Sequence, residues 1–260
     1  SLLGRLCFPV LRPDIDFRFA KAYYARISDR LNGRVCRLFI FPVLTALRTF
    51  YPDQPFLTYL AAFRYPLAGE MAMDLDLARH IRVPSDWGLE DGLLAEVYNN
   101  LSLKEICQVD VAGRYDHKHQ ELSAGDDAGG LSKMSIDICK ALFRKLATRG
   151  VTFNTESFRS LKATYYRIAL DFVETYHNDA VMNGLTLDIH NEEKAVELFA
   201  ENIMKAGEAF LDRPMERPFI PSWSRVISAI PDVLHQLREA VEADHAEFGS
   251  AGEVDAAANT

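Results

Sequence analysis

The sequence predicts an α/β fold that continues into a purely helical region, and three observations support this. Before about residue 125, helical patterns alternate with short apolar runs and with Gly and Pro. After it, long amphipathic patterns dominate. Between them, SAGDDAGG (123–130) has the composition of a flexible connection. We therefore expect an α/β domain over 1–125, a helical extension over 126–248 and a disordered tail over 249–260.

Strand and helix patterns alternate in the first region. Two short runs rich in apolar residues predict strands, KAYYAR (21–26) and EICQVDV (105–111). Two longer patterns, each beginning near a Gly, predict helices over 35–50 and 87–98. RYPLAGE (64–70) contains Pro and Gly, which disfavour regular structure, and predicts a loop between them.

Four amphipathic patterns predict the helices of the second region. The first covers 132–149 and ends at a Gly, and the second begins with Asn154 as its N-cap. The third carries apolar residues at three- and four-residue steps: Val196, Phe199, Ile203 and Phe210. The fourth covers 224–248 and is interrupted or restarted at Pro231, because proline breaks a helix interior.

The charge balance and the cysteines exclude several classes of protein. Twenty-nine basic against 37 acidic residues give a formal charge of −8 over 260 residues. This balance argues against a non-specific nucleic-acid binder, which needs a clustered basic surface. The four cysteines are scattered with no CxxC pair, which predicts reduced thiols in a cytoplasmic protein.

The apolar runs predict no membrane segment. The strongest run, 38–47, contains Pro42 and is far shorter than the ~20 residues of a spanning helix. The first residues carry no small-residue cleavage site, so we expect no signal peptide. The chain begins without Met and directly on an amphipathic pattern. We therefore expect it to be a fragment that begins inside a helix.

A histidine-rich segment is the first candidate site. In an extended backbone His117 and His119 point to the same side, where both could face one ligand. Imidazole suits a divalent metal, and Lys118 and Arg114 could neutralise a phosphate. The alternative is a solvated polar loop, since a lone HxH pattern is weakly specific.

The second candidate is GRVCR (33–37) at a predicted helix start. Free backbone N–H groups, the positive end of the helix dipole and an Arg side chain together favour an anionic group such as phosphate. The alternative is an ordinary Gly before a helix whose Arg residues face solvent.

The acidic patterns are interpreted as structural. Two DxD patterns (14–16 and 74–76) do not follow apolar strands, which a metal–diphosphate motif needs for rigid support. A turn at Asp14 and a helix cap at Asp74 explain them better. Capping at helix ends also explains a set that could be drawn together as metal ligands: His177, Asp179, His190 and Glu193.

Five motifs in order resemble those of glucosyl-3-phosphoglycerate synthases, which are retaining glycosyltransferases of the GT-A fold. They are KAYYAR, GRVCRL, RYPLAGE, WGLEDGLLAEVY and QVDVAGRYDHKHQ. The resemblance covers about residues 1–245. It implies transfer of glucose from a nucleoside-diphosphate glucose to the 2-hydroxyl of 3-phosphoglycerate, with retention and with Mg²⁺ or Mn²⁺. A metal ion would stabilise the departing diphosphate.

The same resemblance implies roles for individual residues. His117 is similar to the family's metal-binding histidine, and Lys118 and His119 line the same mouth. Gly33 and Arg34 resemble the loop that grips the acceptor phosphate, with Cys36 where the family often has Thr.

The remaining roles concern the sugar and its surroundings. The loop between donor sugar and acceptor corresponds to Leu67, Ala68, Gly69 and Glu70, and Glu90 to the acid that holds sugar hydroxyls. We take Glu90, Leu67 and Glu70 as the catalytic candidates. Lys21 adds positive charge near donor or acceptor.

One departure from the family pattern concerns the beginning of the chain. The family's DxD motif lies shortly before the region that matches Ser1, so we expect the C-terminal part of the enzyme, inactive alone. The donor base (uridine or guanosine) stays open. Alternatives are a related enzyme such as a mannosyl-3-phosphoglycerate synthase, or a non-catalytic helical module in which 131–248 is an interaction surface. We expect a homodimer and no nucleic-acid or membrane partner.

Overall fold

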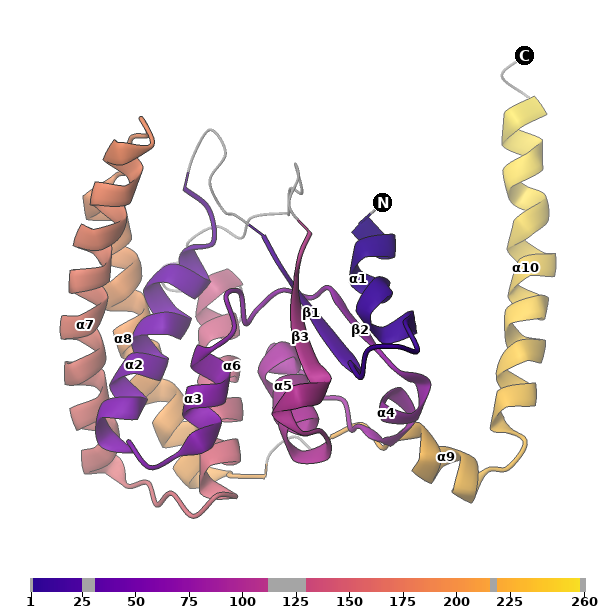
Figure 1. The fold of residues 1–260 in the computed structure, drawn as a ribbon, viewed down its shortest axis with the longest axis horizontal. Coiled ribbons are helices and arrows are strands. Elements are labelled where there is room, and N and C mark those ends of the chain that lie inside the picture. Colours follow the sequence, from indigo (N-terminus) through magenta and orange to yellow (C-terminus); the bar gives the residue numbers. More distant parts are fainter. Residues whose placement is uncertain (1, 25–30, 112–129, 216–218, 258–260) are drawn as a thin grey trace.

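A small mixed sheet forms the centre of the first region (Figure 1). The computed structural model describes residues 2–24, 31–111, 130–215 and 219–257. In it, β1 (Phe19–Tyr23) lies between β2 (Met71–Met73), to which it is antiparallel, and β3 (Ile106–Asp110), to which it is parallel. The two predicted strands correspond to β1, shifted toward the N-terminus, and to β3. The α/β prediction is confirmed.

Helices cover the sheet and connect its strands. They are α1 (Leu2–Leu11), η1 (Cys36–Ile40), α2 (Phe41–Phe50), α3 (Pro55–Ala61), α4 (Leu75–His80), α5 (Leu89–Asn100) and the short 3-10 helix η2 (Leu103–Glu105). The helix predicted over 35–50 is confirmed, except that its first turn, η1, is a π-helix. Such wide turns are rare in proteins, and those that do occur are frequently found at functional sites.

Local signals account for several element ends. Asp74 caps α4, its side chain accepting the Leu77 backbone N–H at 2.6 Å. It also binds Arg18. The predicted capping role of Asp74 is therefore confirmed, and its carboxylate is engaged in structure.

The second region consists of helices, as predicted. They are α6 (Gly130–Ala147), α7 (Thr155–Met182), α8 (Ile189–Asp212), α9 (Trp223–Ala229) and α10 (Val233–Ala257). Asn154 is the N-cap of α7, and its side chain accepts the Ser157 backbone N–H at 2.8 Å. The interruption at Pro231 separates α9 from α10. The prediction of a disordered tail over 249–260 differs from the structure, in which helix α10 continues to Ala257. The last residues of this helix include Ala and Glu, whose high helix propensity does not depend on an apolar face.

One apolar core joins the two regions. It contains side chains from β1, α2, α3, α5, α6, α7 and α8. Phe39 of η1 lies 5.0 Å from Phe199 of α8 between ring centroids, and the Tyr165 hydroxyl of α7 donates to the Leu38 carbonyl at 2.7 Å. Burial of such aromatic side chains is the main stabilising term of a core.

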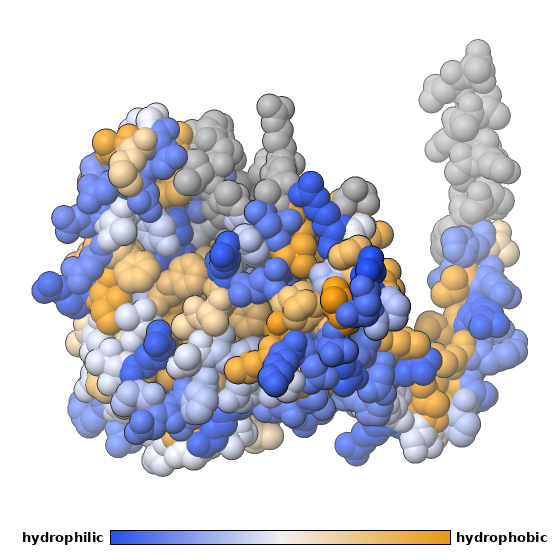
Figure 2. Space-filling model, in the orientation of Figure 1, coloured by the Kyte–Doolittle hydropathy of each residue, from blue (hydrophilic) through white to orange (hydrophobic). Residues whose placement is uncertain are grey.

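Helix α10 stands apart from this core (Figure 1). Ile230, just before it, and Leu234, Leu237 and Val241 on it are exposed, and Figure 2 shows apolar side chains along the lower part of the helix. The spacing of Leu234, Leu237 and Val241 places these three on one stripe of α10, whereas Ile230 lies before the helix, at the end of α9. In the described part of the chain, no helix combines the length and apolar character needed to cross a membrane. All four cysteines are free.

Candidate functional site

A buried lysine lies at the centre of the candidate site. Lys21 follows Phe19 by two residues in β1, so both side chains point to the face that is covered by the large apolar core. Lys21 is fully buried, and its Nζ donates to the Ala68 carbonyl. Burial lowers the pKa of Lys21 to about 8, against the opposing effect of nearby Glu90, Cys36, Asp91 and Glu70.

Three carboxyl groups surround this amine. Glu90 and Asp91 lie in the first turn of α5, and Glu70 immediately precedes β2. Burial raises the pKa of Glu90 and raises that of Asp91 to about 7. Oδ2 of Asp91 is buried and has no hydrogen-bond partner among the described residues. We call Lys21, Ala68, Glu70, Glu90 and Asp91 the lysine cluster.

The loop of residues 64–70 is fixed to β1 beside the lysine cluster. The Ala22 N–H donates to the Glu70 carbonyl at 3.0 Å, and the Tyr24 hydroxyl donates to Glu70 Oε2 at 3.4 Å. Gly69 faces Glu90: a Cβ on Gly69 would lie 3.9 Å from Glu90 Oε1. Leu67 is partly buried and packs against the apolar clusters on both sides of the sheet.

A second group of charges lies at the start of η1. Gly33 has φ of 75°, a left-handed conformation that favours glycine, and its carbonyl accepts the Arg37 N–H at 3.0 Å. Arg34 Nε donates to Glu192 Oε1 of α8 at 2.8 Å. Arg37 Nη1 lies 2.7 Å from Glu192 Oε2, close enough for an ion pair although their alignment is outside hydrogen-bond geometry.

We call Arg34, Arg37, Tyr176 and Glu192 the arginine cluster. The Arg37 guanidinium lies 5.0 Å from the Tyr176 ring centroid, in a cation–π contact. The side chain of Arg37 is 6% exposed and that of Arg34 29%. Both arginines pair with Glu192, but only Arg37 is withdrawn from solvent, since the side chain of Arg34 stays partly exposed.

Cys36 connects the two clusters. Its thiol is buried in η1 and lies close enough to Lys21 and to Tyr176 to affect the pKa of both. The side chains predicted for the sugar, the loop and the acceptor phosphate thus lie on neighbouring elements. Their roles stay predictions.

The histidine segment cannot be placed in the same way. His117, Lys118 and His119, with Arg114, lie outside the described residues. The strands that lead there do have a defined arrangement: Tyr23 pairs with Asp110 at the carboxyl ends of β1 and β3. Ligands of α/β sheets bind at such carboxyl ends. Within the described part of the chain, no three His, Cys, Asp or Glu residues come together as a possible metal site.

Comparison with known proteins identifies the relatives of the chain. No family model matches. A glucosyl-3-phosphoglycerate synthase of Persephonella marina is 44% identical over 95% of this chain and 61% of its own length, and one of Methanococcoides burtonii is 43% identical with the same coverage. The chain is a homologue of glucosyl-3-phosphoglycerate synthases. It spans about three fifths of the length of these curated relatives, and the resemblance predicted from the five motifs is confirmed.

Solved structures from the glucosyl-3-phosphoglycerate synthases and a related family are also similar. The mannosyl-3-phosphoglycerate synthase of Rubrobacter xylanophilus has 31% identity and a TM-score of 0.47, covering 59% of this chain and 44% of that one. The glucosyl-3-phosphoglycerate synthase of Mycobacterium tuberculosis, in complex with Mn²⁺, UDP and phosphoglyceric acid, has 27% identity and a TM-score of 0.43, covering 55% and 43%.

Four members of the two clusters were assigned no site role from the sequence: Asp91, Arg37, Tyr176 and Glu192. Asp91 adjoins Glu90 in WGLEDG, so an acidic pair at a helix start was a usable signal. Arg37 lies within GRVCR, but no role was assigned to it. Glu192 lies 158 residues from Arg34, and no local pattern connects the two.

Proposed function

We propose that this chain forms the acceptor and sugar side of a glycosyltransferase that moves glucose from a nucleoside-diphosphate glucose to the 2-hydroxyl of 3-phosphoglycerate, with retention. The observation that carries the proposal is the 44% identity to a glucosyl-3-phosphoglycerate synthase over 95% of the chain. The convergence of the predicted residues Lys21, Glu70 and Glu90 in one cluster supports it. Residues 1–125 would then supply part of a GT-A fold and 126–248 its helical extension.

In this proposal the lysine cluster positions the sugar. Lys21 holds the Ala68 carbonyl and so fixes the loop that reaches Glu70. The carboxylates of Glu70 and Glu90 can accept hydrogen bonds from sugar hydroxyls, which orients the anomeric carbon for transfer. Burial of these groups strengthens such bonds, because little water competes for them.

The arginine cluster positions the acceptor. Glu192 occupies Nε of Arg34, and the side chain keeps enough exposure for its terminal amino groups to bind a phosphate oxygen. Glu192 holds the guanidinium in one orientation, which lowers the conformational entropy that phosphate binding costs. Gly33 lets the backbone approach the same ligand closely.

The metal expectation depends on residues outside the described ones. Mg²⁺ or Mn²⁺ held by His117 would neutralise charge on the departing diphosphate. The described residues gather no site for this ion, so its ligands would come from elsewhere. We also infer a homodimer, because the exposed apolar stripe of Leu234, Leu237 and Val241 on α10 has the spacing of a helix–helix seam.

Calorimetric titration with 3-phosphoglycerate tests the acceptor site without requiring turnover. We expect Arg34→Ala to weaken binding at least tenfold, while Arg48→Ala, on exposed α2 surface, leaves it unchanged. D-Glycerate, which lacks the phosphate, should not distinguish the variants. Equal 3-phosphoglycerate affinity of Arg34→Ala and the unmodified chain would refute the phosphate role.

Transfer assays with UDP-glucose, GDP-glucose and GDP-mannose decide the donor. A preference for GDP-mannose would favour the mannosyl alternative. Absence of 3-phosphoglycerate binding would favour the helical interaction module.

A further inference from the structure

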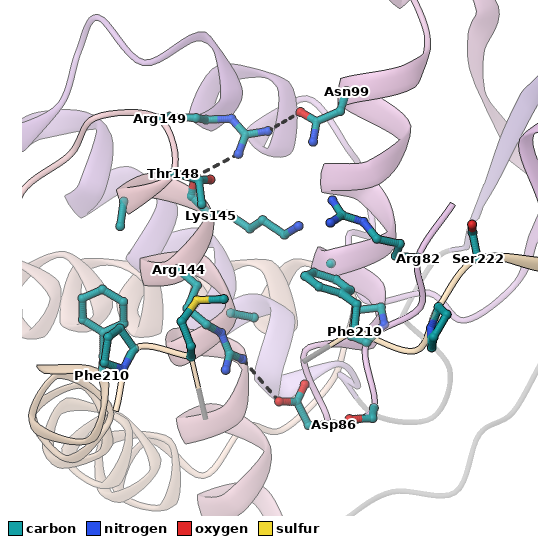
Figure 3. A pocket seen from close by; sticks show the side chains of 18 of the residues that line it. Arg82, Asp86, Asn99, Arg144, Lys145, Thr148, Arg149, Phe210, Phe219 and Ser222 are labelled. Atoms are coloured by element: carbon teal, nitrogen blue, oxygen red, sulfur yellow. Dashed lines mark hydrogen bonds and ion pairs between the residues drawn. The ribbon is translucent and has the colours of Figure 1, made fainter. Parts of the chain in front are cut away.

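A pocket of about 850 Å³ lies away from both clusters, and it shares no lining residue with them. Its walls are the segment before α5, the end of α6 and the chain that follows α8. Figure 3 shows Arg144 and Lys145 of α6, and Arg149 just after it, on one side, with Arg82 and Phe219 opposite. The volume falls within the range of small-molecule sites, about 300–1,000 Å³.

Backbone contacts build this pocket into the fold. The Ile220 N–H donates to the Val83 carbonyl at 2.8 Å, and the Ser224 hydroxyl donates to the Arg79 carbonyl at 3.0 Å. Gly92 lies so close to Pro84 that a Cβ would approach Pro84 Cγ to 2.2 Å. The segment of residues 219–225 is therefore held against the segment before α5, and the walls are defined without a ligand.

The lining carries an excess of positive charge. Five lining side chains are basic, namely Arg82, Arg144, Lys145, Arg149 and Arg225. Among the lining side chains that the structure describes, Asp86 is the one acidic residue. Glu96 does not line the pocket, but its carboxylate contacts the lining residue Arg82.

The two carboxylates do not balance these cations. Glu96 Oε1 lies 3.0 Å from Arg82 Nη2 and 3.3 Å from Lys145 Nζ, so one carboxylate serves two cations. Asp86 Oδ2 lies 3.3 Å from Arg144 Nη2. The other terminal nitrogen of Arg144, Nη1, is buried with no hydrogen-bond partner among the described residues.

Two further arginines form no ion pair with an acidic residue in the described part of the chain. Arg149 binds the neutral side chain of Asn99, at 2.7 Å, and lies over the Phe56 ring. Arg225, exposed on α9, makes no ion pair with a described residue. Burial lowers the pKa of Lys145 and of Arg149, against the opposing effect of nearby Glu96.

Apolar surface accompanies these cations. The Phe219 ring centroid lies 4.1 Å from Lys145 Nζ and 5.1 Å from the Arg82 guanidinium carbon. Phe210 and Pro221 extend this surface along the pocket. A ligand that fits both features has a charged end and an apolar body.

We propose that this pocket binds a small organic anion, with its phosphate or carboxylate group among Arg144, Lys145, Arg149 and Arg225 and its apolar part against Phe219. An anion there would offset the uncompensated cations of the lining. It would also join the segment of residues 219–225 to α6. The site is distinct from the proposed acceptor site at Arg34 and does not depend on it.

Calorimetric titration of the full chain with phenyl phosphate tests this proposal, with benzoate, inorganic phosphate and phenol as further arms. We expect phenyl phosphate or benzoate to bind, and the stronger of the two identifies the anionic group. Inorganic phosphate should bind at least tenfold more weakly than phenyl phosphate, and phenol should not bind. Binding of none of the anions, or equal affinity for phenol, would overturn the proposal.

Variants distinguish this pocket from other anion sites. Arg225→Glu should weaken binding at least tenfold, and Arg149→Gln should weaken it several-fold. The matched reversal Arg238→Glu, on exposed α10, and Arg34→Ala at the proposed acceptor site should leave the affinity within twofold. Arg225 is exposed, so Arg225→Glu should unfold at the temperature of the unmodified chain. Unchanged affinity in Arg225→Glu and Arg149→Gln, or loss of binding in Arg34→Ala alone, would contradict the assignment.

Discussion

Glu192 is the residue on which the arginine cluster depends, and replacing it by alanine tests that dependence. Its side chain is 2% exposed and is shared by Arg34 and Arg37. Without it, the buried Arg37 keeps the Asn32 carbonyl at 3.0 Å and the Tyr176 ring, but no carboxylate within the described residues. Breaking a buried ion pair from one side costs about 3–5 kcal/mol, because a buried charge is left uncompensated.

The two arginines should contribute unequally. Arg34→Ala removes a partner that is 29% exposed while Glu192 keeps Arg37. Loss of a pair that remains accessible to water costs about 1 kcal/mol or less. Glu192→Gln should fall between the two, because the amide oxygen still accepts a hydrogen bond while the charge is lost.

Urea unfolding followed by circular dichroism measures these differences. For a chain of this size about 3–5 kcal/mol corresponds to a melting temperature lower by roughly 10 °C. Glu197→Ala, exposed on the same helix, is the matched control and should change the free energy of unfolding by less than about 0.5 kcal/mol. If Glu192→Ala unfolds within about 1 kcal/mol of the unmodified chain, Arg37 does not need this carboxylate and the reasoning fails.

Two further predictions concern the lysine cluster and α10. The pKa of Asp91, raised to about 7 chiefly by burial, exceeds its usual value of 3.8. The native state therefore holds a proton that the unfolded state releases, and Asp91 lowers stability as pH rises from about 4 to 7, by at most about 1.4 kcal/mol per pH unit. In urea titrations, the free energy of unfolding of Asp91→Asn should therefore rise relative to that of the unmodified chain between pH 4 and pH 7. Parallel curves would exclude this. On α10, Leu237→Glu should shift the mass measured by light scattering from that of a dimer to that of a monomer, whereas Gln236→Glu should leave it unchanged. If Leu237→Glu remains a dimer, the apolar stripe of α10 is not the dimer interface.

Local sequence signals predicted much of the secondary structure. Asn154 and Asp74 cap helices as expected, since a short polar side chain before a helical pattern satisfies its first N–H groups. The break at Pro231 followed from the missing N–H of proline. Strand β2 was not predicted, because three residues are too few for an alternation to be recognised. The π-helical turn at Cys36 has no sequence signal of its own.

Long-range pairing limited the prediction of the candidate site. Motif resemblance selected Lys21, Glu70 and Glu90, and the structure brings them together. The full burial of Lys21 could not be predicted from an alternating strand pattern, since lysine in a strand most often faces water. Glu192 was beyond prediction for a different reason: only the packing of α8 on η1 brings it to Arg34.

The continuous apolar core limits how this chain can change in evolution. Helices α7 and α8 supply part of the core that surrounds η1. Homologues therefore cannot exchange the helical extension as an independent unit by recombination at the 123–130 boundary. A graft from a relative would have to bring matching partners for Leu38, Phe39 and the arginines beside them. Substitutions on the two sides of that boundary should therefore be inherited together, and chimeras joined there should fold only between close relatives.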